Sequence, residues 1–406
     1  IWNIQKRPQN VVNQMHQGND QSKQRIESFP VKVEFLSELK RHTAPVNVVR
    51  FSPKGDYLAS AGDDSCIIIW KLSPTMETFN NEYATEAWSV VLMFYGHNKE
   101  IYDLAWSPCG KYIITGSIDN TARVWSLPEK KCIQVFSDHS HYVQGVSWDP
   151  LGQYVSTQSS DRSVSLYKYR QGSNDQLIFA QRRKFSKSTK QKESFHLYHD
   201  ENLVTFFRRL SFSPDGGLLI TPSGLNKSTG ATQEELELKN CAYLYARNRF
   251  SKQQEEHVGY IGNYPSPSIA VRWCPVLYKK RSNFPPAFAL PYRMLYALAT
   301  KNTVYIYDTQ QYRPICSIGG MHFASLTDLT WSHDGSILMC SSEDGYCSAI
   351  VFSEGEMGTP HIIQLENMAE DVEMKQAIPE KRSEITEKEA DPSKPKKRRI
   401  TPTQVK

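Results

Sequence analysis

The 406-residue sequence lacks the short motifs on which many nucleotide-binding, hydrolytic and zinc-dependent sites are built. It contains no G-x-x-x-x-G-K-[ST] phosphate loop, no G-x-S-x-G nucleophile elbow and no H-E-x-x-H zinc pair. We therefore expect a chain that is not an enzyme, with no catalytic residues, no metal site and no cofactor.

A strong charge of one sign is also lacking, because 48 Lys and Arg residues stand against 43 Asp and Glu residues. A net charge of +5 is too small for a protein whose whole surface binds nucleic acid, so any basic function must be local. No run approaches the roughly 18 apolar residues of a membrane-spanning helix. The sequence therefore predicts at most indirect contact with DNA and none with a membrane.

Closely spaced cysteine pairs are missing as well. The eight cysteines are scattered and form no C-x-x-C motif. Most of them lie in apolar or strand-like runs, which is typical of reduced thiols in a protein of the cytosol or nucleus.

A repeated turn is the strongest pattern that is present. Ser52-Pro53-Lys54-Gly55 recurs at residues 107–110, 149–152 and 213–216, and in a weaker form at 332–335. Each turn follows a short alternating strand, and a later strand of the unit closes on an aromatic residue such as Trp70 or Trp125. Units of about 40 to 45 residues with this pattern predict the blades of a β-propeller.

These units resemble WD repeats over nearly all of residues 1–353, which implies an all-β propeller. The resemblance implies a buried set of histidine, hydroxyl, carboxylate and aromatic side chains that links neighbouring strands. The expected members are His42, Asp64 and Trp70, with Gly62 in place of the hydroxyl; His97, Ser117, Asp119 and Trp125; and His139, Ser159, Asp161 and Tyr167. Buried polar groups need partners, so a structural role is favoured over catalysis.

The number of units predicts seven blades, of which the first is incomplete in this chain. Ile1-Trp2-Asn3-Ile4 looks like the last strand of a repeat, and six units follow, centred on residues 42–70, 97–125, 139–167, 199–245, 264–308 and 322–352. We expect about 35 to 45 further residues to precede Ile1 in the complete protein.

Several longer phrases narrow the resemblance. They are Val46–Pro53, His141–Gly152, Phe206–Phe212, Leu290–Arg293, Tyr307–Gln311 and Asp344–Ser348. Together they resemble the WD-repeat (p60/Cac2-type) subunits of chromatin assembly factor one, with HIRA as a relative. That family implies a nuclear, non-catalytic scaffold in a histone chaperone complex that deposits new core histones on replicating DNA. Its implied partners are the large and small subunits of the factor, and core histones through the complex.

The end of the chain changes character. Residues 354–393 are polar, with nine acidic and four basic residues between Glu366 and Asp391, which predicts a flexible and disordered linker. The basic run at 394–406 resembles the short motif with which both chaperone families bind the histone chaperone Asf. That resemblance implies that Arg398 and Arg399 meet carboxylates, Ile400 enters an apolar groove, and Thr401 and Pro402 continue the strand, with Val405 as support.

Other uses remain open. A nuclear-import signal explains Lys394, Lys396, Lys397, Arg398 and Arg399 equally well. A HIRA-type replication-independent subunit and a substrate adaptor of a cullin ubiquitin ligase are alternatives, although the Trp-Asp-x-Arg pattern of such adaptors is replaced by Trp70-Lys71-Leu72-Ser73. The basic segment 181–192 is interpreted as a solvated loop rather than a DNA or protein contact.

Overall fold

The structure, a computed structural model, describes one compact unit that runs from Ile1 to His361. The described residues are 1–6, 30–74, 83–172, 176–188, 194–203, 205–229, 236–251, 257–282 and 286–361. They form strands and a single short 3₁₀ helix at Arg247–Arg249, which confirms the all-β class. No helix in this part of the chain is long and apolar enough to cross a membrane.

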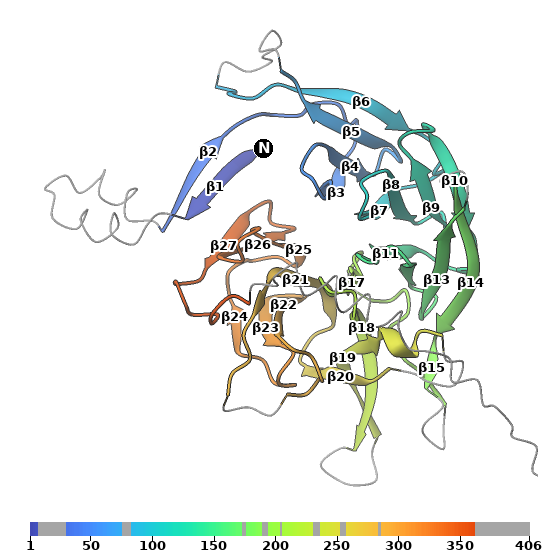
Figure 1. Ribbon diagram of the computed structural model, residues 1–406. Coiled ribbons are helices and arrows are strands. Elements are labelled where there is room, and N and C mark those ends of the chain that lie inside the picture. The colour runs from blue at the N-terminus through green and yellow to red at the C-terminus, as the bar shows by residue number, and fades with distance from the viewer. Residues whose placement is uncertain are drawn as a thin grey trace, which may run out of the picture. The chain divides into compact units, whose positions relative to one another are not determined.

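Six antiparallel blades follow one another around a common axis (Figure 1). The first two consist of β3 (Val46–Phe51), β4 (Leu58–Gly62), β5 (Ile67–Leu72) and β6 (Trp88–Phe94), and of β7 (Ile101–Trp106), β8 (Tyr112–Ser117), β9 (Ala122–Ser126) and β10 (Lys131–Phe136). The third contains β11 (Val143–Trp148), β12 (Tyr154–Ser159), β13 (Ser163–Gln171) and β14 (Leu177–Phe185).

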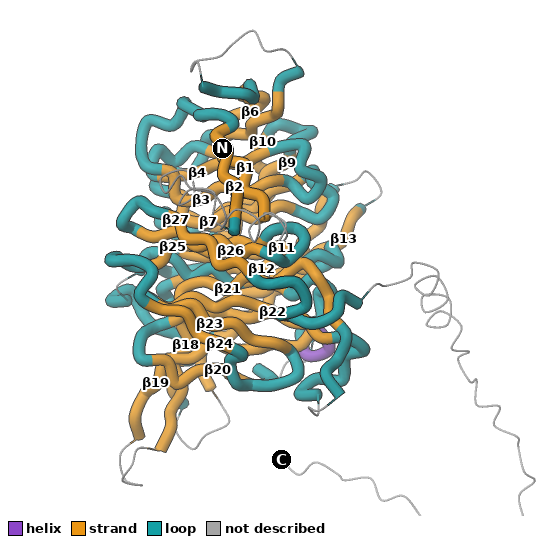
Figure 2. The backbone as a smooth tube through the Cα atoms, turned by 90° about the vertical axis from the view of Figure 1, so that its left-hand side faces the viewer, coloured by secondary structure: helices purple, strands orange, loops and turns teal. Residues whose placement is uncertain are grey.

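The fourth blade contains β17 (Ser211–Phe212), β18 (Leu218–Thr229), β19 (Leu236–Ala246) and β20 (Gly259–Tyr264). The fifth contains β21 (Ser268–Tyr278), β22 (Arg293–Thr300), β23 (Thr303–Asp308) and β24 (Cys316–Gly319), and the sixth has β25 (Leu326–Trp331), β26 (Ile337–Ser342) and β27 (Cys347–Val351). A short ribbon of β15 (Lys187–Ser188) and β16 (Phe195–His196) precedes the fourth blade. The long strands β18 and β19 extend beyond the rest of the unit (Figures 1 and 2).

The prediction of seven blades is wrong, because the described residues form six blades of three or four strands. The N-terminal residues do form a strand, β1 (Trp2–Lys6), but its one partner is β2 (Val31–Phe35), in a separate two-stranded sheet. The sequence interpretation overlooked the apolar alternation of Val31–Phe35, which provides that partner. The side chain of Lys6 places β1 beside the sixth blade by donating to the carbonyl of Phe352.

The predicted end of the propeller also shifts. Residues 354–361, which were assigned to the acidic linker, fold back onto the fifth blade: the amide of Lys279 donates to the carbonyl of Thr359, and that of His361 to Leu277. The rest of the predicted linker, residues 362–393, lies outside the described residues.

The repeated turns explain why each unit starts with two paired strands. In the first blade the amide of Gly55 donates to the carbonyl of Ser52 at 2.9 Å, and the hydroxyl of Ser52 accepts from the amide of Tyr57 at 3.1 Å. The turn glycine has φ of +77°, a left-handed conformation that favours glycine. The same left-handed glycine occurs at residues 110, 152, 216 and 335.

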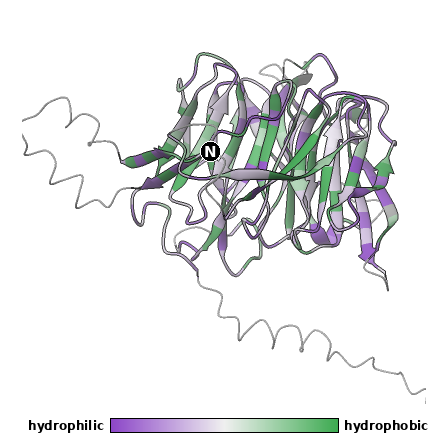
Figure 3. Cartoon of the chain, turned by 90° about the horizontal axis from the view of Figure 1, so that it is seen from above, coloured by the Kyte–Doolittle hydropathy of each residue, from purple (hydrophilic) through white to green (hydrophobic). Residues whose placement is uncertain are grey.

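The hydrophobic core lies between blades rather than inside one sheet. Ile67 and Phe94 of the first blade pack against Ile101, Leu104 and Trp125 of the second, and similar clusters fill the following interfaces. In Figure 3 the hydrophobic stretches lie mainly on the strands. Backbone hydrogen bonds join strands within a blade, so side chains must hold one blade to the next.

Five charged side chains meet at the axis, and we call them the axial ion cluster: Arg50, Asp103, Arg209, Arg272 and Asp328. Arg209, just before β17, donates to Asp103 Oδ1 in the second blade at 2.7 Å and to the carbonyl of Asn47 in the first at 2.7 Å. Its Nε donates to the carbonyl of Thr327 in the sixth blade at 3.2 Å. One guanidinium therefore joins four blades.

The remaining members of the axial ion cluster extend these links to the fifth blade. Asp328 receives Arg50 at 2.6 Å and Arg272 at 3.0 Å. Burial alone would raise the pKa of Asp328, but the three arginines around it hold that pKa well below its usual range. Asp103 Oδ2 also accepts from the amide of Val146 in the third blade at 3.0 Å, so all six blades contribute to the cluster.

Replacing Arg209 with alanine is expected to lower the free energy of unfolding by about 3–5 kcal/mol, because it leaves the carboxylate of Asp103 buried without its closest cation. The exposed Arg170 is the control, and Arg170→Ala should change the same quantity by less than about 0.5 kcal/mol. Denaturant unfolding measures both. Equal effects of the two substitutions would show that the axial ion cluster does not stabilise the ring.

Candidate protein-docking site

The predicted docking and import residues lie outside the described residues. They are Lys394, Lys396, Lys397, Arg398, Arg399, Ile400, Thr401, Pro402 and Val405. The docking motif and the import signal therefore stay predictions, and other candidate surfaces have to come from the described unit.

The structure brings together the histidine, aspartate and tryptophan expected in the second blade. His97 Nδ1 lies 2.9 Å from Asp119 Oδ2, and His97 Nε2 lies 2.8 Å from the hydroxyl of Thr115. The indole of Trp125 donates to that hydroxyl at 2.8 Å. Asp119 accepts from Nδ1–H, so the neutral imidazole carries its proton there and accepts the Thr115 hydroxyl proton at Nε2.

The hydroxyl of this network was assigned to the wrong residue. Ser117 donates to the carbonyl of Lys99 and accepts from the amide of Asp119, and it makes no contact with His97. Side chains two residues apart on a strand share a face, so the sequence pattern places Thr115 and Ser117 equally well. The structure selects Thr115 because it lies opposite both the imidazole and the indole.

The same correction applies to the third blade. His139 pairs with Asp161 at 3.0 Å and with the hydroxyl of Thr157 at 2.7 Å, whereas Ser159 donates to the carbonyl of His141. Tyr167 departs from the tryptophan pattern by donating to Asp138 at 3.1 Å.

In the first blade a hydroxyl is present, so the expectation that Gly62 stands in its place is wrong. Ser60 lies 2.7 Å from His42 Nε2 and accepts from the indole of Trp70 at 2.8 Å, while His42 Nδ1 lies 2.8 Å from Asp64.

A cysteine replaces the hydroxyl in the sixth blade. Cys340 lies 3.7 Å from Nε2 of His322, whose Nδ1 is 3.1 Å from Asp344. The sequence analysis missed this pair, although a spacing could have found it. The histidine and aspartate are 22 residues apart in the pairs 42/64, 97/119, 139/161 and 322/344. Four occurrences of one His-to-Asp spacing indicate the network without reference to the hydroxyl.

Electrostatics assign these pairs to structure. Burial lowers the pKa of His97, while the hydrogen bond to Asp119 opposes that shift only in part. Burial would raise the pKa of Asp119, but hydrogen bonds from His97 and Thr121 hold it well below its usual range. Near neutral pH the pair is a carboxylate and a neutral imidazole, and its polar atoms are occupied. Within the described ranges no group of three or more His, Cys, Asp or Glu residues is placed to hold a metal ion.

The basic segment at 181–192 is partly engaged inside the unit. Arg182 binds Asp138 at 2.7 Å, and Lys184 binds Asp161 at 3.0 Å. The guanidinium of Arg183 donates to the carbonyl of Arg249. Intramolecular partners therefore take up the charges of its first described residues.

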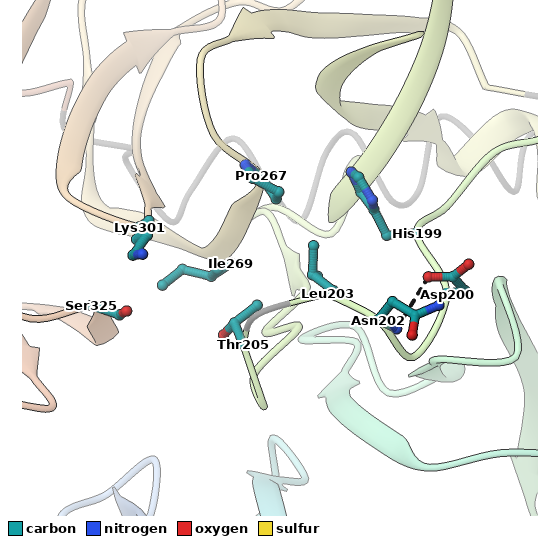
Figure 4. Close-up of a pocket in the computed structure, with 9 residues that line it drawn as sticks. All are labelled: His199, Asp200, Asn202, Leu203, Thr205, Pro267, Ile269, Lys301 and Ser325. Atoms are coloured by element: carbon teal, nitrogen blue, oxygen red, sulfur yellow. Dashed lines mark hydrogen bonds between the residues drawn. The ribbon is translucent and has the colours of Figure 1, made fainter.

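The described surface has a half-open cavity of about 360 Å³, which we call the axial cavity (Figure 4). It lies between the fourth, fifth and sixth blades, and its walls are mainly apolar. The lining residues are His199, Asp200, Asn202, Leu203, Thr205, Pro267, Ile269, Lys301 and Ser325. The carbonyl of Ile269 accepts from the amide of Arg209 at 2.8 Å, so the cavity adjoins the axial ion cluster.

Two of the polar side chains in the axial cavity already have partners. His199 Nε2 lies 2.8 Å from the side-chain oxygen of Asn240, and Asp200 is paired with Arg162 at 2.5 Å. No nucleophile and general base face each other among its lining residues. A rigid apolar cavity of this kind is suited to binding a side chain rather than to chemistry.

Comparison with known proteins places the chain in a family. The profile of the CAF1B/HIR1 beta-propeller domain matches residues 20–357. The chain belongs to this CAF1B/HIR1 family. The resemblance derived from the sequence phrases is thereby confirmed.

Individual relatives within the CAF1B/HIR1 family agree. A chromatin assembly factor 1 protein of the B type from Gallus gallus is 37% identical over 388 residues, covering 90% of this chain and 64% of that protein. The chromatin assembly factor 1 subunit FAS2 homolog of Oryza sativa subsp. japonica is 40% identical over 339 residues, covering 80% and 64%. Protein HIR1 of Yarrowia lipolytica is 27% identical over 354 residues, covering 82% and 32%. The chain thus spans less than two thirds of each of these relatives.

The blade network gives a direct test of the corrected hydroxyl. Thr115→Val should lower the free energy of unfolding by about 1–3 kcal/mol, because His97 and Trp125 both lose their buried partner. Thr303→Val removes a hydroxyl whose contact with Asn302 is exposed, and should cost less than about 0.5 kcal/mol. Equal costs in denaturant unfolding would contradict the assignment to Thr115.

Proposed function

We propose that this chain is the WD-repeat subunit of a nuclear chromatin assembly complex, where it acts as a non-catalytic scaffold for nucleosome assembly on replicating DNA. The observation that carries the proposal is the family match over residues 20–357, with identities of 37% and 40% to chromatin assembly factor 1 proteins. The lower identity of 27% to a HIR1 protein favours this role over that of a HIR1-type subunit.

The geometry supports a scaffold. The histidines and aspartates that would attract attention in an enzyme are paired within blades. Six blades joined by the axial ion cluster hold their loops in fixed positions, and rigid elements that present loops are suited to partner binding. The partners we propose are the large and small subunits of the assembly factor. Core histones and DNA are reached through the complex.

The C-terminal motif is proposed to dock the Asf chaperone as an added strand. Main-chain hydrogen bonds supply general affinity, while alternate side chains supply choice. Burying Ile400 contributes about 1.5–3 kcal/mol, and each charge-assisted bond to Arg398 or Arg399 about the same. The same basic residues, with Lys394, Lys396 and Lys397, serve nuclear import when the chain is not bound to Asf.

Assembly can be tested with the full chain and purified large and small subunits. We expect copurification in a stable complex, and a loss of histone deposition on replicating DNA when this chain is omitted, because the scaffold then no longer joins its partners. Cross-linking mass spectrometry identifies the contacts. Cross-links to subunits of a replication-independent chaperone, with none to the large subunit of chromatin assembly factor one, would overturn the proposal.

Docking and import can be separated at one residue. Ile400→Ala should raise the Kd for Asf by about tenfold or more, because the apolar groove loses its occupant, and should leave nuclear import unchanged. Ile385→Ala, in the acidic linker, is the matched control and should change neither. Pull-down and import assays measure the two functions. Retained Asf binding by both Ile400→Ala and Arg398→Glu would refute the docking motif.

A further inference from the structure

Aromatic side chains are exposed beside the axial cavity, and we call Tyr102, Tyr142 and Phe206 the aromatic rim. Phe206 is 60% exposed, and its ring centroid lies 5.7 Å from that of Tyr102. Tyr142 is 36% exposed, and its ring centroid lies 4.1 Å from that of His141. Large rings held in water by a rigid scaffold are a mark of an interaction surface.

The aromatic rim and the axial cavity lie at the same end of the inner strands. Phe206 directly follows Thr205 of the cavity wall. Tyr102 is the second residue of β7, just as Ile269 of the cavity wall is the second residue of β21. Rim and cavity therefore form one surface with an apolar hollow next to flat rings.

This surface is supported from below by the axial ion cluster. The guanidinium of Arg209 lies 4.3 Å from the ring centroid of Phe207, and that ring lies 6.0 Å from Tyr102. Because Arg209 is itself fixed by contacts with three other blades, the rings are held in place before any partner arrives, which reduces the entropy lost on binding.

The charge around the surface is negative. Burial raises the pKa of Tyr102 to about 12, and the carboxylates of Glu100 and Asp63 add to that shift, which places both close to its hydroxyl. Asp63 accepts from the side-chain amide of Asn47 at 2.7 Å rather than from a cation. Glu100 has no ion-pair partner in the part of the chain that the structure describes.

Two more carboxylates flank the axial cavity. Glu201 is exposed and follows Asp200 of the cavity wall, and Glu343 is exposed and donates its amide to the carbonyl of Ser325 at 2.9 Å. Among the described residues neither has an ion-pair partner, and the nearby cations that also lack one there are Lys99 and Lys301. Four carboxylates thus stand against two ammonium groups.

We propose that the aromatic rim and axial cavity bind an extended lysine- or arginine-rich segment of a partner protein, with one apolar side chain seated in the cavity. A cation over the rings of Phe206 and Tyr102 gains cation–π attraction, and the carboxylates of Glu100 and Asp63 neutralise it. The cavity, with Leu203 in its wall, takes a side chain of the size of leucine. Phosphates of a nucleic acid would be repelled here. This surface is separate from the tail motif of the proposed function.

The experiment uses the full chain and three synthetic peptides of about twelve residues, with Kd measured by isothermal titration calorimetry. The first peptide alternates lysine and alanine around one central leucine and is expected to bind. The second has glutamate for every lysine and should not bind. The third has alanine for the leucine and should bind about tenfold more weakly, because the cavity stays empty.

Matched variants locate the binding. Phe206→Ala and Glu100→Gln should each raise the Kd of the first peptide by about fivefold or more. Phe51→Ala and Glu354→Gln are the controls, since Phe51 is 54% exposed at the opposite end of its inner strand and Glu354 is exposed after the sixth blade. Neither control should change the Kd.

Several results would overturn the proposal. They are no binding of the lysine peptide, equal binding of the glutamate peptide, and indifference to both rim variants. A DNA duplex that bound the chain and was released by Phe206→Ala would assign the surface to nucleic acid. Alanine at the five basic positions of 394–399 should leave the Kd unchanged; a tighter Kd would make this chain's own tail the occupant.

Discussion

Arg209 is the residue on which the ring most depends. The strand hydrogen bonds of a propeller close within each blade, so they do nothing to hold the first blade near the sixth. Arg209 reaches from the fourth blade to the first, second and sixth, and with Arg272 and Asp328 it extends the contacts to the fifth. Desolvating five charges is costly, and the arrangement is stable only because each carboxylate meets at least one guanidinium and a backbone donor.

The same constraint explains why the candidate sites lie at the ends of the strands. Polar side chains inside the ring are committed to holding blades and turns, as the His97, Thr115 and Asp119 network shows. The surface above the axis, with its exposed rings and carboxylates, is what is left for partners. A scaffold subunit needs this division between a saturated interior and a presented surface, because a partner then gains affinity without reorganising the ring.

Much of the fold follows from local chemistry and could be predicted. Turns such as Ser52–Gly55 and alternating strands such as Val46–Phe51 depend on neighbouring residues, and the structure has them where the sequence indicated. The choice of Thr115 over Ser117 could not be predicted, since both side chains share a face and only the position of His97 decides. The contact of Arg209 with Asn47 joins residues 162 apart, and no local pattern carries that information. The pairing of β1 with β2 was missed for the same reason.

The long sequence separations at the axis have a consequence for the order of folding. Hairpins such as β7–β8 join residues a few positions apart and lose little loop-closure entropy, so they are expected to form early. Arg209 finds its partners only after segments 106 to 162 residues away have come together. The axial contacts therefore belong to the last and slowest stage, and a nascent chain exposes the faces of its finished blades until the sixth has been synthesised.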